Sequence, residues 1–335
     1  MSTKVGEVQN IMKILKRSAH GYAQDPTKNL GLEVYEGQGN PDVALIVAAF
    51  DFHAGCWKQF DFDDQEIARI KKKKVVRLEF EEPNKFFIIE DFDSYDPDFY
   101  KVFTLCPYTA EYLNAQQGCE RRVPIFFPFN GKHIPPVTQK KYDIIYTGHL
   151  HPKPILRDVK LISRFNYRLV SNASHDLITD RGVGYEEKIH LISQSRITLV
   201  HNLLYPTFTH LRNVWRYPEW QSNRAFSELP TPWQAAKFFT NKADMVVPQL
   251  KSRVFEAAFS RSLILCKRDP FNVIENFFEP EREFVYYEEG RLVETVSEIL
   301  RSYDDYQLII ERAFERAQRE YTTEAFFNKF LKDIV

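Results

Sequence analysis

Arg253 and Glu256 are the residues whose types and spacing most clearly suggest chemistry. They lie three residues apart, directly before an apolar stretch at 262–266. On a helix this spacing puts both side chains on one face. A guanidinium near a helix N-terminus suits a diphosphate, and a neighbouring carboxylate can accept hydrogen bonds from ribose hydroxyls. The pair therefore indicates a site for a sugar nucleotide, although a surface ion pair on an amphipathic helix would have the same spacing.

Short apolar runs that alternate with helical patterns would position this pair. In the first part of the chain, strands are predicted at 43–50, 75–80, 86–89, 102–106 and 123–127, with helices at 64–72 and 110–117. Because it contains Pro124, the last of these strands is predicted at a sheet edge. The stretch 128–141 has the turn composition of a linker. After it, strands are predicted at 142–147, 167–172, 196–201, 262–266 and 283–287, with helices at 154–164, 185–193, 251–260, 273–278, 292–302 and 307–331.

Strands that feed helices in this order are typical of parallel, doubly wound sheets, which bind ligands at the carboxyl ends of their strands. We therefore predict an α/β protein in which two such domains face a cleft. The expected limits are 1–135 for an N-terminal domain, 136–310 for a C-terminal domain and 311–335 for a helical segment. An aromatic-rich stretch at 203–247 suits sugar stacking, subunit contacts or ordinary core packing.

The composition excludes several classes of protein. With 45 basic and 46 acidic residues among 335, the chain lacks the basic surplus needed to coat nucleic acid. No apolar run approaches the roughly 20 residues of a membrane helix, and residues 1–16 lack the apolar core of a signal peptide. The four cysteines, at 56, 106, 119 and 266, do not have zinc-site spacing. We therefore expect a cytoplasmic globular protein with reduced cysteines and no membrane span.

Four stretches resemble GT-B glycosyltransferases, and they occur in the order of that family. The segment from Arg253 resembles the R-x-x-E-(A/T)-x-(A/S) helix, although Phe259 stands at its last small position. It is most similar to the CgeB-like group (glycosyl transferase family 1, second type) and to phage DNA β-glucosyltransferases. Residues 278–296 resemble the stretch that follows this helix, and 142–151 resemble the strand and glycine loop that open the donor domain. The fourth stretch, at 100–113 and 123–129, resembles the end of the N-terminal domain.

The resemblance implies a GT-B fold of two Rossmann-like domains, the N-terminal one binding the acceptor and the C-terminal one the nucleotide-sugar donor. It further implies that Glu256 binds the donor ribose and Arg253 the diphosphate. Gly148 would let the backbone approach the donor closely, because glycine has no Cβ. His149 and His151 stand where family members contact the donor phosphates. An exposed turn is the alternative for these two histidines.

An inverting transfer needs a general base that removes the proton of the acceptor hydroxyl. In GT-B enzymes this base normally comes from the N-terminal domain, near strand ends that face the cleft. Asp51 and His53 directly follow the predicted strand at 43–50, and we predict that one of them is the base. A structural cap at the strand end is the alternative. Many retaining GT-B enzymes have a second Glu eight residues before the helix Glu; Pro248 occupies that position here and favours an inverting mechanism.

The predicted function is sugar transfer from a nucleotide-sugar donor, UDP- or GDP-linked, to a hydroxyl of a glycan, protein or nucleic-acid acceptor. Neither a metal nor a further cofactor is expected. One alternative is a GT-A enzyme, because Asp91 and Asp93 resemble the short DxD motif that binds Mn²⁺ or Mg²⁺. A DNA-modifying glucosyltransferase is a second alternative, weakened by the near-neutral charge. A non-catalytic sugar-nucleotide-binding protein is the third.

Overall fold

The computed structural model describes residues 13–17, 31, 43–48, 64–79, 99–150, 153–204 and 247–334. The chain separates into two compact units, each formed from separate stretches of sequence. Unit 1 combines Met1–Pro128, Pro206–Thr231 and Thr323–Val335; unit 2 combines Phe129–Tyr205 and Pro232–Thr322. The domain limits expected from the sequence remain predictions.

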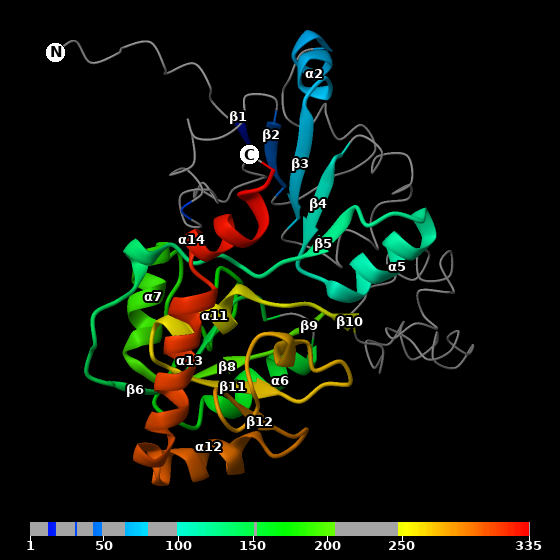
Figure 1. Ribbon diagram of the computed structural model, residues 1–335. Coiled ribbons are helices and arrows are strands. Elements are labelled where there is room, and N and C mark those ends of the chain that lie inside the picture. The colour runs from blue at the N-terminus through cyan, green and yellow to red at the C-terminus, as the bar shows by residue number, and fades with distance from the viewer. Residues whose placement is uncertain are drawn as a thin grey trace, which may run out of the picture. The chain divides into compact units, whose positions relative to one another are not determined.

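Unit 1 is built on a parallel sheet with the strand order β1-β2-β3-β4-β5 (Figure 1). The strands are β1 (Lys13–Arg17), β2 (Val43–Ala48), β3 (Lys74–Glu79), β4 (Lys101–Thr104) and β5 (Arg122–Pro124), with helices α2 (Asp64–Lys71) and α5 (Pro107–Gln117). As predicted, the strand that contains Pro124 lies at a sheet edge. Proline is tolerated there because an edge strand has a neighbour on one side only, so the missing N–H need not cost an inter-strand hydrogen bond. β1 was not predicted, because its sequence, KILKR, is charged at both ends. The predicted strand at 86–89 lies outside the described residues.

The C-terminal end of the chain completes the apolar core of unit 1. Helix α14 (Thr323–Phe326) continues into a π-helix at Phe327–Leu331. The ring of Phe126 lies 5.6 Å, centroid to centroid, from the rings of both Phe326 and Phe330. These last residues belong to unit 1, whereas the residues up to Thr322 belong to unit 2.

Unit 2 contains a second parallel sheet, with the order β12-β11-β8-β6-β7. Its strands are β6 (Tyr142–Thr147), β7 (Tyr167–Val170), β8 (Ser195–Val200), β11 (Leu263–Lys267) and β12 (Val285–Tyr287). The chain runs from β6 to one edge and then returns to build the other side, so the strand order reverses between β6 and β8. In such sheets the ligand crevice lies at this reversal, outside the carboxyl ends of the strands.

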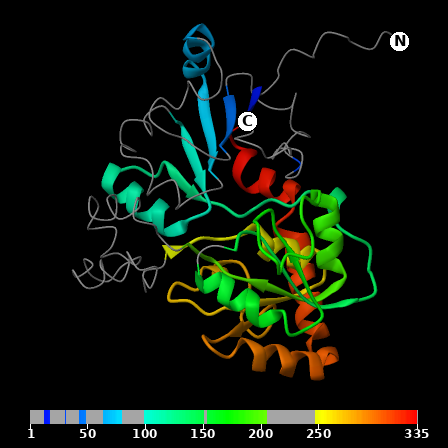
Figure 2. The same ribbon diagram turned by 180° about the vertical axis from the view of Figure 1, so that it is seen from behind.

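Helices cover both faces of this sheet. They are α6 (Lys153–Ile162), α7 (Tyr185–Ser193), α11 (Ser252–Phe259), α12 (Leu292–Arg301) and α13 (Gln307–Glu320). α6 packs beside α12, whereas α11 packs beside α7 and α13. Figure 2, which shows the molecule from behind, gives the clearer view of α6. The central strands are apolar on both faces because both are covered. Ile144, Ile197 and Leu265 in these strands are completely buried.

A short antiparallel pair connects β8 to α11. β9 (Leu203–Leu204) pairs with β10 (Val247–Pro248), so the two ends of the aromatic-rich stretch meet. Buried Asn202 reinforces the junction: its carbonyl oxygen accepts from the Gln249 amide at 2.8 Å, and its Oδ1 from the Lys251 amide at 3.1 Å. These contacts fix the start of α11 relative to the end of β8.

The structure confirms the predicted α/β class with two parallel sheets. The predicted helix at 273–278 is a 3₁₀ turn at Val273–Asn276. Within the described residues, no helix has the length and apolar character required to cross a membrane.

Candidate donor site

Arg253 lies against the glycine turn that follows β6. Gly148 has a φ of 129°, a conformation that L side chains rarely adopt. A Cβ built on Gly148 would overlap Nη2 of Arg253 and lie 3.1 Å from its Cζ. The guanidinium also stacks on Tyr146, with Cζ 4.8 Å from the ring centroid, a favourable cation–π distance. The structure thus brings Arg253 and Gly148 together at the carboxyl edge of the sheet.

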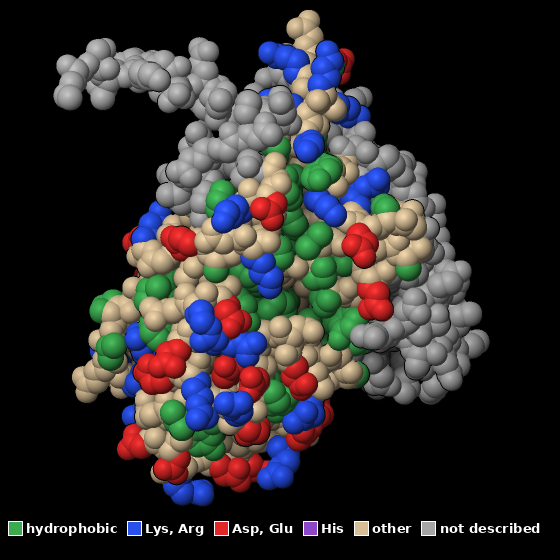
Figure 3. Space-filling view, viewed as in Figure 1, with side chains coloured by type: hydrophobic (Ala, Val, Ile, Leu, Met, Phe, Trp, Pro, Cys, Tyr) green, Lys and Arg blue, Asp and Glu red, His purple; other side chains and the backbone are tan. Residues whose placement is uncertain are grey.

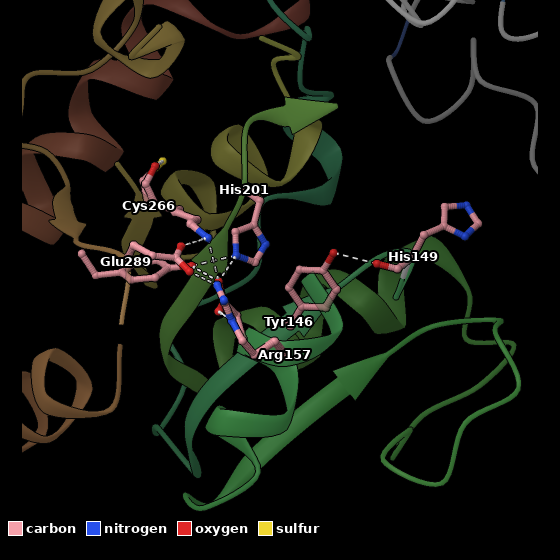
Figure 4. A network of polar contacts seen from close by, with 9 residues as sticks. Tyr146, His149, Arg157, His201, Cys266 and Glu289 are labelled. Carbon is pink, nitrogen blue, oxygen red and sulfur yellow. Dashed lines mark hydrogen bonds and ion pairs between the residues drawn. The ribbon is translucent and has the colours of Figure 1, made fainter. Parts of the chain in front are cut away.

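The two predicted histidines differ in what the structure describes of them. His149 is exposed, and its imidazole points away from Tyr146 and His201 (Figure 4). Its carbonyl oxygen accepts a 2.8 Å hydrogen bond from the hydroxyl of Tyr146, which closes the turn after β6. His151 lies outside the described residues. The backbone of His149 therefore has a defined structural role in this turn.

Glu256 follows Arg253 on α11 but is buried, with only 3% of its surface exposed. Its Oε1 accepts a 2.8 Å hydrogen bond from Nζ of Lys188, a residue of α7. Its Oε2 is buried and has no hydrogen-bond partner among the described residues. The surface ion pair that the spacing also allowed is therefore the wrong interpretation. A buried carboxylate oxygen without a partner is costly, and a ligand hydroxyl would satisfy it.

An aromatic ring lies beside the Lys188 ammonium. Nζ of Lys188 lies 4.5 Å from the centroid of the Tyr185 ring, one helical turn earlier on α7. Burial, with a smaller contribution from the charge of Glu256, raises the pKa of Tyr185 well above its usual range. Tyr185 therefore stays neutral and presents a ring to the ammonium. His133 packs edge-on against the same ring at 5.1 Å.

A second buried cluster lies beside Tyr146, at the carboxyl ends of three neighbouring strands (Figure 4). His201 follows β8, Lys267 ends β11 and Tyr287 ends β12, and all three meet Asp158 of α6. Oδ2 of Asp158 accepts from the Tyr287 hydroxyl at 2.9 Å and from Lys267 at 3.4 Å, and lies 3.1 Å from Nε2 of His201. The His201 and Tyr146 rings are 5.9 Å apart. The cluster therefore ties the strand ends together beside Tyr146, the residue on which Arg253 stacks.

The charges in this cluster are set by burial and hydrogen bonding. Burial alone would raise the pKa of Asp158, but the hydrogen bond and charge of His201, with the charge of Lys267, lower it to about 2. Burial lowers the pKa of His201 below its ordinary value, although Asp158 acts in the opposite direction. At the rim, Glu289 forms ion pairs with Arg157 and Lys267. An ionised Asp158 thus anchors the network at neutral pH.

The remaining predicted site residues lie outside the described part of the chain. These are Asp51 and His53, proposed as the base, and Asp91 and Asp93, proposed as a metal motif. Within the described residues, no group of three or more His, Cys, Asp or Glu side chains could hold a metal ion.

Sequence reasoning missed Lys188 and the Asp158 cluster. Lys188 is 68 residues from Glu256 in the sequence, and no local pattern connects them. Three of the four cluster residues belong to three different elements, and His201 directly follows a fourth. The only available signal was positional, because His201, Lys267 and Tyr287 each lie at or just after the end of a predicted strand.

Residues 153–332 match the family model described as glycosyl transferase-like. The match covers more than half of the chain, which therefore belongs to the glycosyl transferase-like family. This membership confirms the enzyme class expected from the sequence. No curated protein matches the chain.

Solved structures place the fold within the GT-B class. The chain is similar to the pneumococcal O-GlcNAc transferase GtfA in complex with UDP and GlcNAc, with a TM-score of 0.52 at 10% identity, over 87% of this chain and 56% of GtfA. It is also similar to Anabaena HepE in complex with UDP. The TM-score is 0.50 at 9% identity, over 92% of this chain and 81% of HepE. For sucrose-phosphate synthase from Thermosynechococcus elongatus the TM-score is 0.52 at 9% identity, over 92% of this chain and 76% of the synthase.

The predicted GT-B fold is confirmed, and it excludes the GT-A alternative at the level of fold. This chain spans just over half the length of GtfA. The narrower resemblance to CgeB-like and phage enzymes remains a prediction.

Proposed function

We propose that this protein transfers a sugar from a nucleoside-diphosphate sugar to an acceptor hydroxyl, with the donor bound at the carboxyl edge of the unit 2 sheet. The observation that carries the proposal is the buried Oε2 of Glu256, an acceptor without a partner among the described residues. It lies on α11 three residues after Arg253, so an acceptor for hydroxyls and a cation for phosphates share one short helix.

Each residue has a role that follows from its chemistry. Glu256 would accept hydrogen bonds from ribose hydroxyls through Oε2. Arg253, in the first turn of α11, would bind the diphosphate together with the helix N-terminus. Gly148 and the backbone of the following turn would leave room for the phosphates and the guanidinium. His149 and His151 remain proposed phosphate contacts.

The reaction we propose is a direct displacement that inverts the anomeric carbon. The acceptor oxygen forms a bond to that carbon while the bond to the diphosphate oxygen breaks, and Asp51 or His53 takes the hydroxyl proton. Arg253 would stabilise the charge that develops on the leaving diphosphate, without a metal ion. Pro248, at the position of the second Glu in many retaining enzymes, supports inversion.

A uridine diphosphate sugar is the donor class we propose first. GtfA was solved with UDP and GlcNAc, and HepE with UDP. A guanosine diphosphate sugar is the second choice. A glycan, a protein and a nucleic acid remain open as acceptors.

A DNA acceptor is the less supported choice. The face seen in Figure 3 carries acidic and basic side chains interspersed over unit 2 rather than a basic stripe. Several charged side chains of unit 2 form ion pairs, among them Arg316 with Glu283 and Arg319 with Glu320. Phosphate recognition along a duplex favours clustered basic residues instead.

A ligand-binding panel tests the donor site. Thermal unfolding would be recorded with UDP, GDP, CDP, ADP and dTDP sugars, each with EDTA or with Mn²⁺, for the wild type, Glu256→Ala and Glu294→Ala. A ligand at 100 times its dissociation constant adds about 2.7 kcal/mol of stability. We expect one nucleotide sugar to stabilise the wild type and Glu294→Ala in EDTA, but not Glu256→Ala.

Glu294 is a matched control because its side chain is 63% exposed and pairs only at the surface with Arg291. Stabilisation that needs Mn²⁺ would contradict the metal-independent mechanism. Stabilisation that survives Glu256→Ala would contradict the donor site. Binding of a nucleotide sugar without transfer to any acceptor or to water would favour the non-catalytic alternative.

A further inference from the structure

The connection between α2 and β3 in unit 1 carries a concentrated positive charge. Residues 69–74 read Arg-Ile-Lys-Lys-Lys-Lys, whereas the whole chain has a net charge of -1. We call residues 69–74 the basic turn. Most of its charged side chains are exposed, namely those of Arg69, Lys71, Lys72 and Lys74. Figure 3 shows basic side chains gathered at this end of unit 1, around α2.

The residues around the basic turn hold it at a fixed place on the surface. Ile70 is buried, with 4% of its surface exposed, and its carbonyl oxygen accepts a 2.9 Å hydrogen bond from the Lys73 amide. Val75, which follows the turn, is buried in the sheet. The acidic residues of α2, Asp64 and Glu66, lie in its first turn, at the other end of the helix. The positive charge is therefore presented by a folded surface.

The neighbouring strand adds an aromatic ring and a further cation. Nζ of Lys74 lies 5.1 Å from the centroid of the Tyr100 ring, and Tyr100 is 47% exposed. Lys101 follows, and its Nζ donates a 2.6 Å hydrogen bond to the carbonyl oxygen of Glu120. Lys74 and Lys101 are the first residues of β3 and β4, which are adjacent parallel strands. The basic turn therefore continues along the amino edge of the unit 1 sheet.

This amino edge lies opposite the edge at which such sheets bind their ligands. The neighbouring strands of the unit 1 sheet all run parallel, so their amino ends share one edge and their carboxyl ends the other. Asp51 and His53, the proposed bases, come after the carboxyl end of β2 in the sequence. The basic turn is therefore suited to attach the protein to a partner, not to bind the reacting groups.

The chemistry of this edge favours a lipid surface over a nucleic acid. Lysine predominates, and its ammonium is a compact charge on a long stem that can extend to anionic headgroups. Nucleic-acid recognition instead favours arginine, whose planar fork binds phosphates and bases in two places at once. The exposed ring of Tyr100 suits a membrane interface, where one end of such a side chain is apolar and the other contacts water.

We propose that the basic turn, together with Tyr100 and Lys101, binds the anionic headgroups of a lipid bilayer and so holds the protein at a membrane surface. The attachment is peripheral and electrostatic, so it is reversible and is weakened by salt. It does not depend on the donor site, because all of these residues belong to unit 1.

Sedimentation with vesicles tests the attachment. The full chain would be mixed, without nucleotide, with vesicles of pure phosphatidylcholine or with vesicles that contain about one third phosphatidylglycerol. At about 0.1 M KCl, the anionic vesicles should bind the protein at least about tenfold more tightly than the neutral ones. At about 0.5 M KCl most of this difference should disappear, because salt screens exposed charges.

Variants then locate the binding surface. Lys72→Gln should weaken binding to anionic vesicles about fivefold, because each cation near such a surface contributes roughly that factor. The triple variant Arg69→Gln/Lys72→Gln/Lys74→Gln should weaken it about 100-fold. A matched control removes three exposed cations of unit 2, namely Lys160→Gln, Arg164→Gln and Arg301→Gln. This control changes the net charge equally and should bind within about twofold of the wild type.

Several results would overturn the proposal. Equal binding to neutral and anionic vesicles would show that headgroup charge is not recognised, and an equal loss in the control would show that the basic turn is not the surface. Binding of a labelled DNA duplex through the same three residues, without binding to vesicles, would assign the surface to a nucleic acid. Thermal unfolding of each variant checks its fold; if the triple variant is destabilised, Lys72→Gln alone decides. Because no nucleotide is present, a failure here leaves the proposed sugar transfer untouched.

Discussion

The guanidinium of Arg253 occupies the space in which a side chain at Gly148 would stand. The residue that opens the turn after β6 and a residue in the first turn of α11 therefore compete for the same space. A glycine is required at this point both by its φ of 129° and by the position of the guanidinium. Gly148 would thus affect the proposed donor site through Arg253 as well as through its own backbone.

Replacement of Gly148 should weaken ligand binding in addition to the loss of stability that a side chain at a positive φ causes. Both Gly148→Ala and Gly290→Ala place a side chain at a positive φ, but a Cβ at Gly290 would meet nothing within 4 Å. Each variant should lose about 1–3 kcal/mol of stability in urea unfolding. Only Gly148→Ala should also weaken UDP binding, by about tenfold, because Arg253 must move. Equal affinities of the two variants would show that Arg253 does not depend on Gly148.

The buried carboxylate of Asp158 should make the free energy of unfolding fall at low pH. Its pKa falls from an ordinary value of 3.8 to about 2 in the folded protein. The stabilisation is therefore fully present above pH 4 and is lost as the pH falls from about 4 to about 2. The loss attributable to this group should be about 2 kcal/mol, since each pKa unit corresponds to about 1.4 kcal/mol.

Asp158→Asn isolates this contribution. Urea unfolding of the wild type and the variant at several pH values between 2 and 6 should show two curves that converge as the pH falls. The variant is expected to be less stable at pH 6, because Lys267 loses its buried counter-charge. Parallel curves would mean that Asp158 does not titrate with a lowered pKa.

The aromatic contacts of the C-terminal segment should be essential to unit 1. Phe326 is completely buried and contacts Phe126, so Phe326→Ala should cost about 3–5 kcal/mol in unfolding free energy. Leu308→Ala, at a side chain of α13 that is 59% exposed, should change stability by less than about 0.5 kcal/mol. Chemical denaturation monitored by far-ultraviolet circular dichroism would measure both. A small effect of Phe326→Ala would show that the C-terminal segment is not part of the core.

Much of the fold could be predicted because local sequence patterns determine it. The apolar runs at 142–147, 196–201 and 262–266 correspond closely to β6, β8 and β11, which are buried on both faces. Such strands are recognisable as continuous apolar stretches. β1 was missed because five residues with charged ends do not form that pattern.

The candidate site was predictable only where its residues are neighbours in sequence. Arg253 and Glu256 could be paired because helical spacing relates them. The pairing of Glu256 with Lys188 and the meeting of Asp158 with Tyr287 depend on how separate elements pack. Packing between distant elements has no local signature, so these contacts required the three-dimensional structure.

The contacts beside the short β9–β10 pair fix the start of α11 relative to the end of β8. Asn202 accepts hydrogen bonds from the backbone amides of both Gln249 and Lys251, although 49 residues separate Asn202 from Lys251 in the sequence. The place of Arg253 and Glu256 at the edge of the sheet therefore depends on a side chain far from them in the sequence. A substitution at Asn202 would thus act on both residues without touching either.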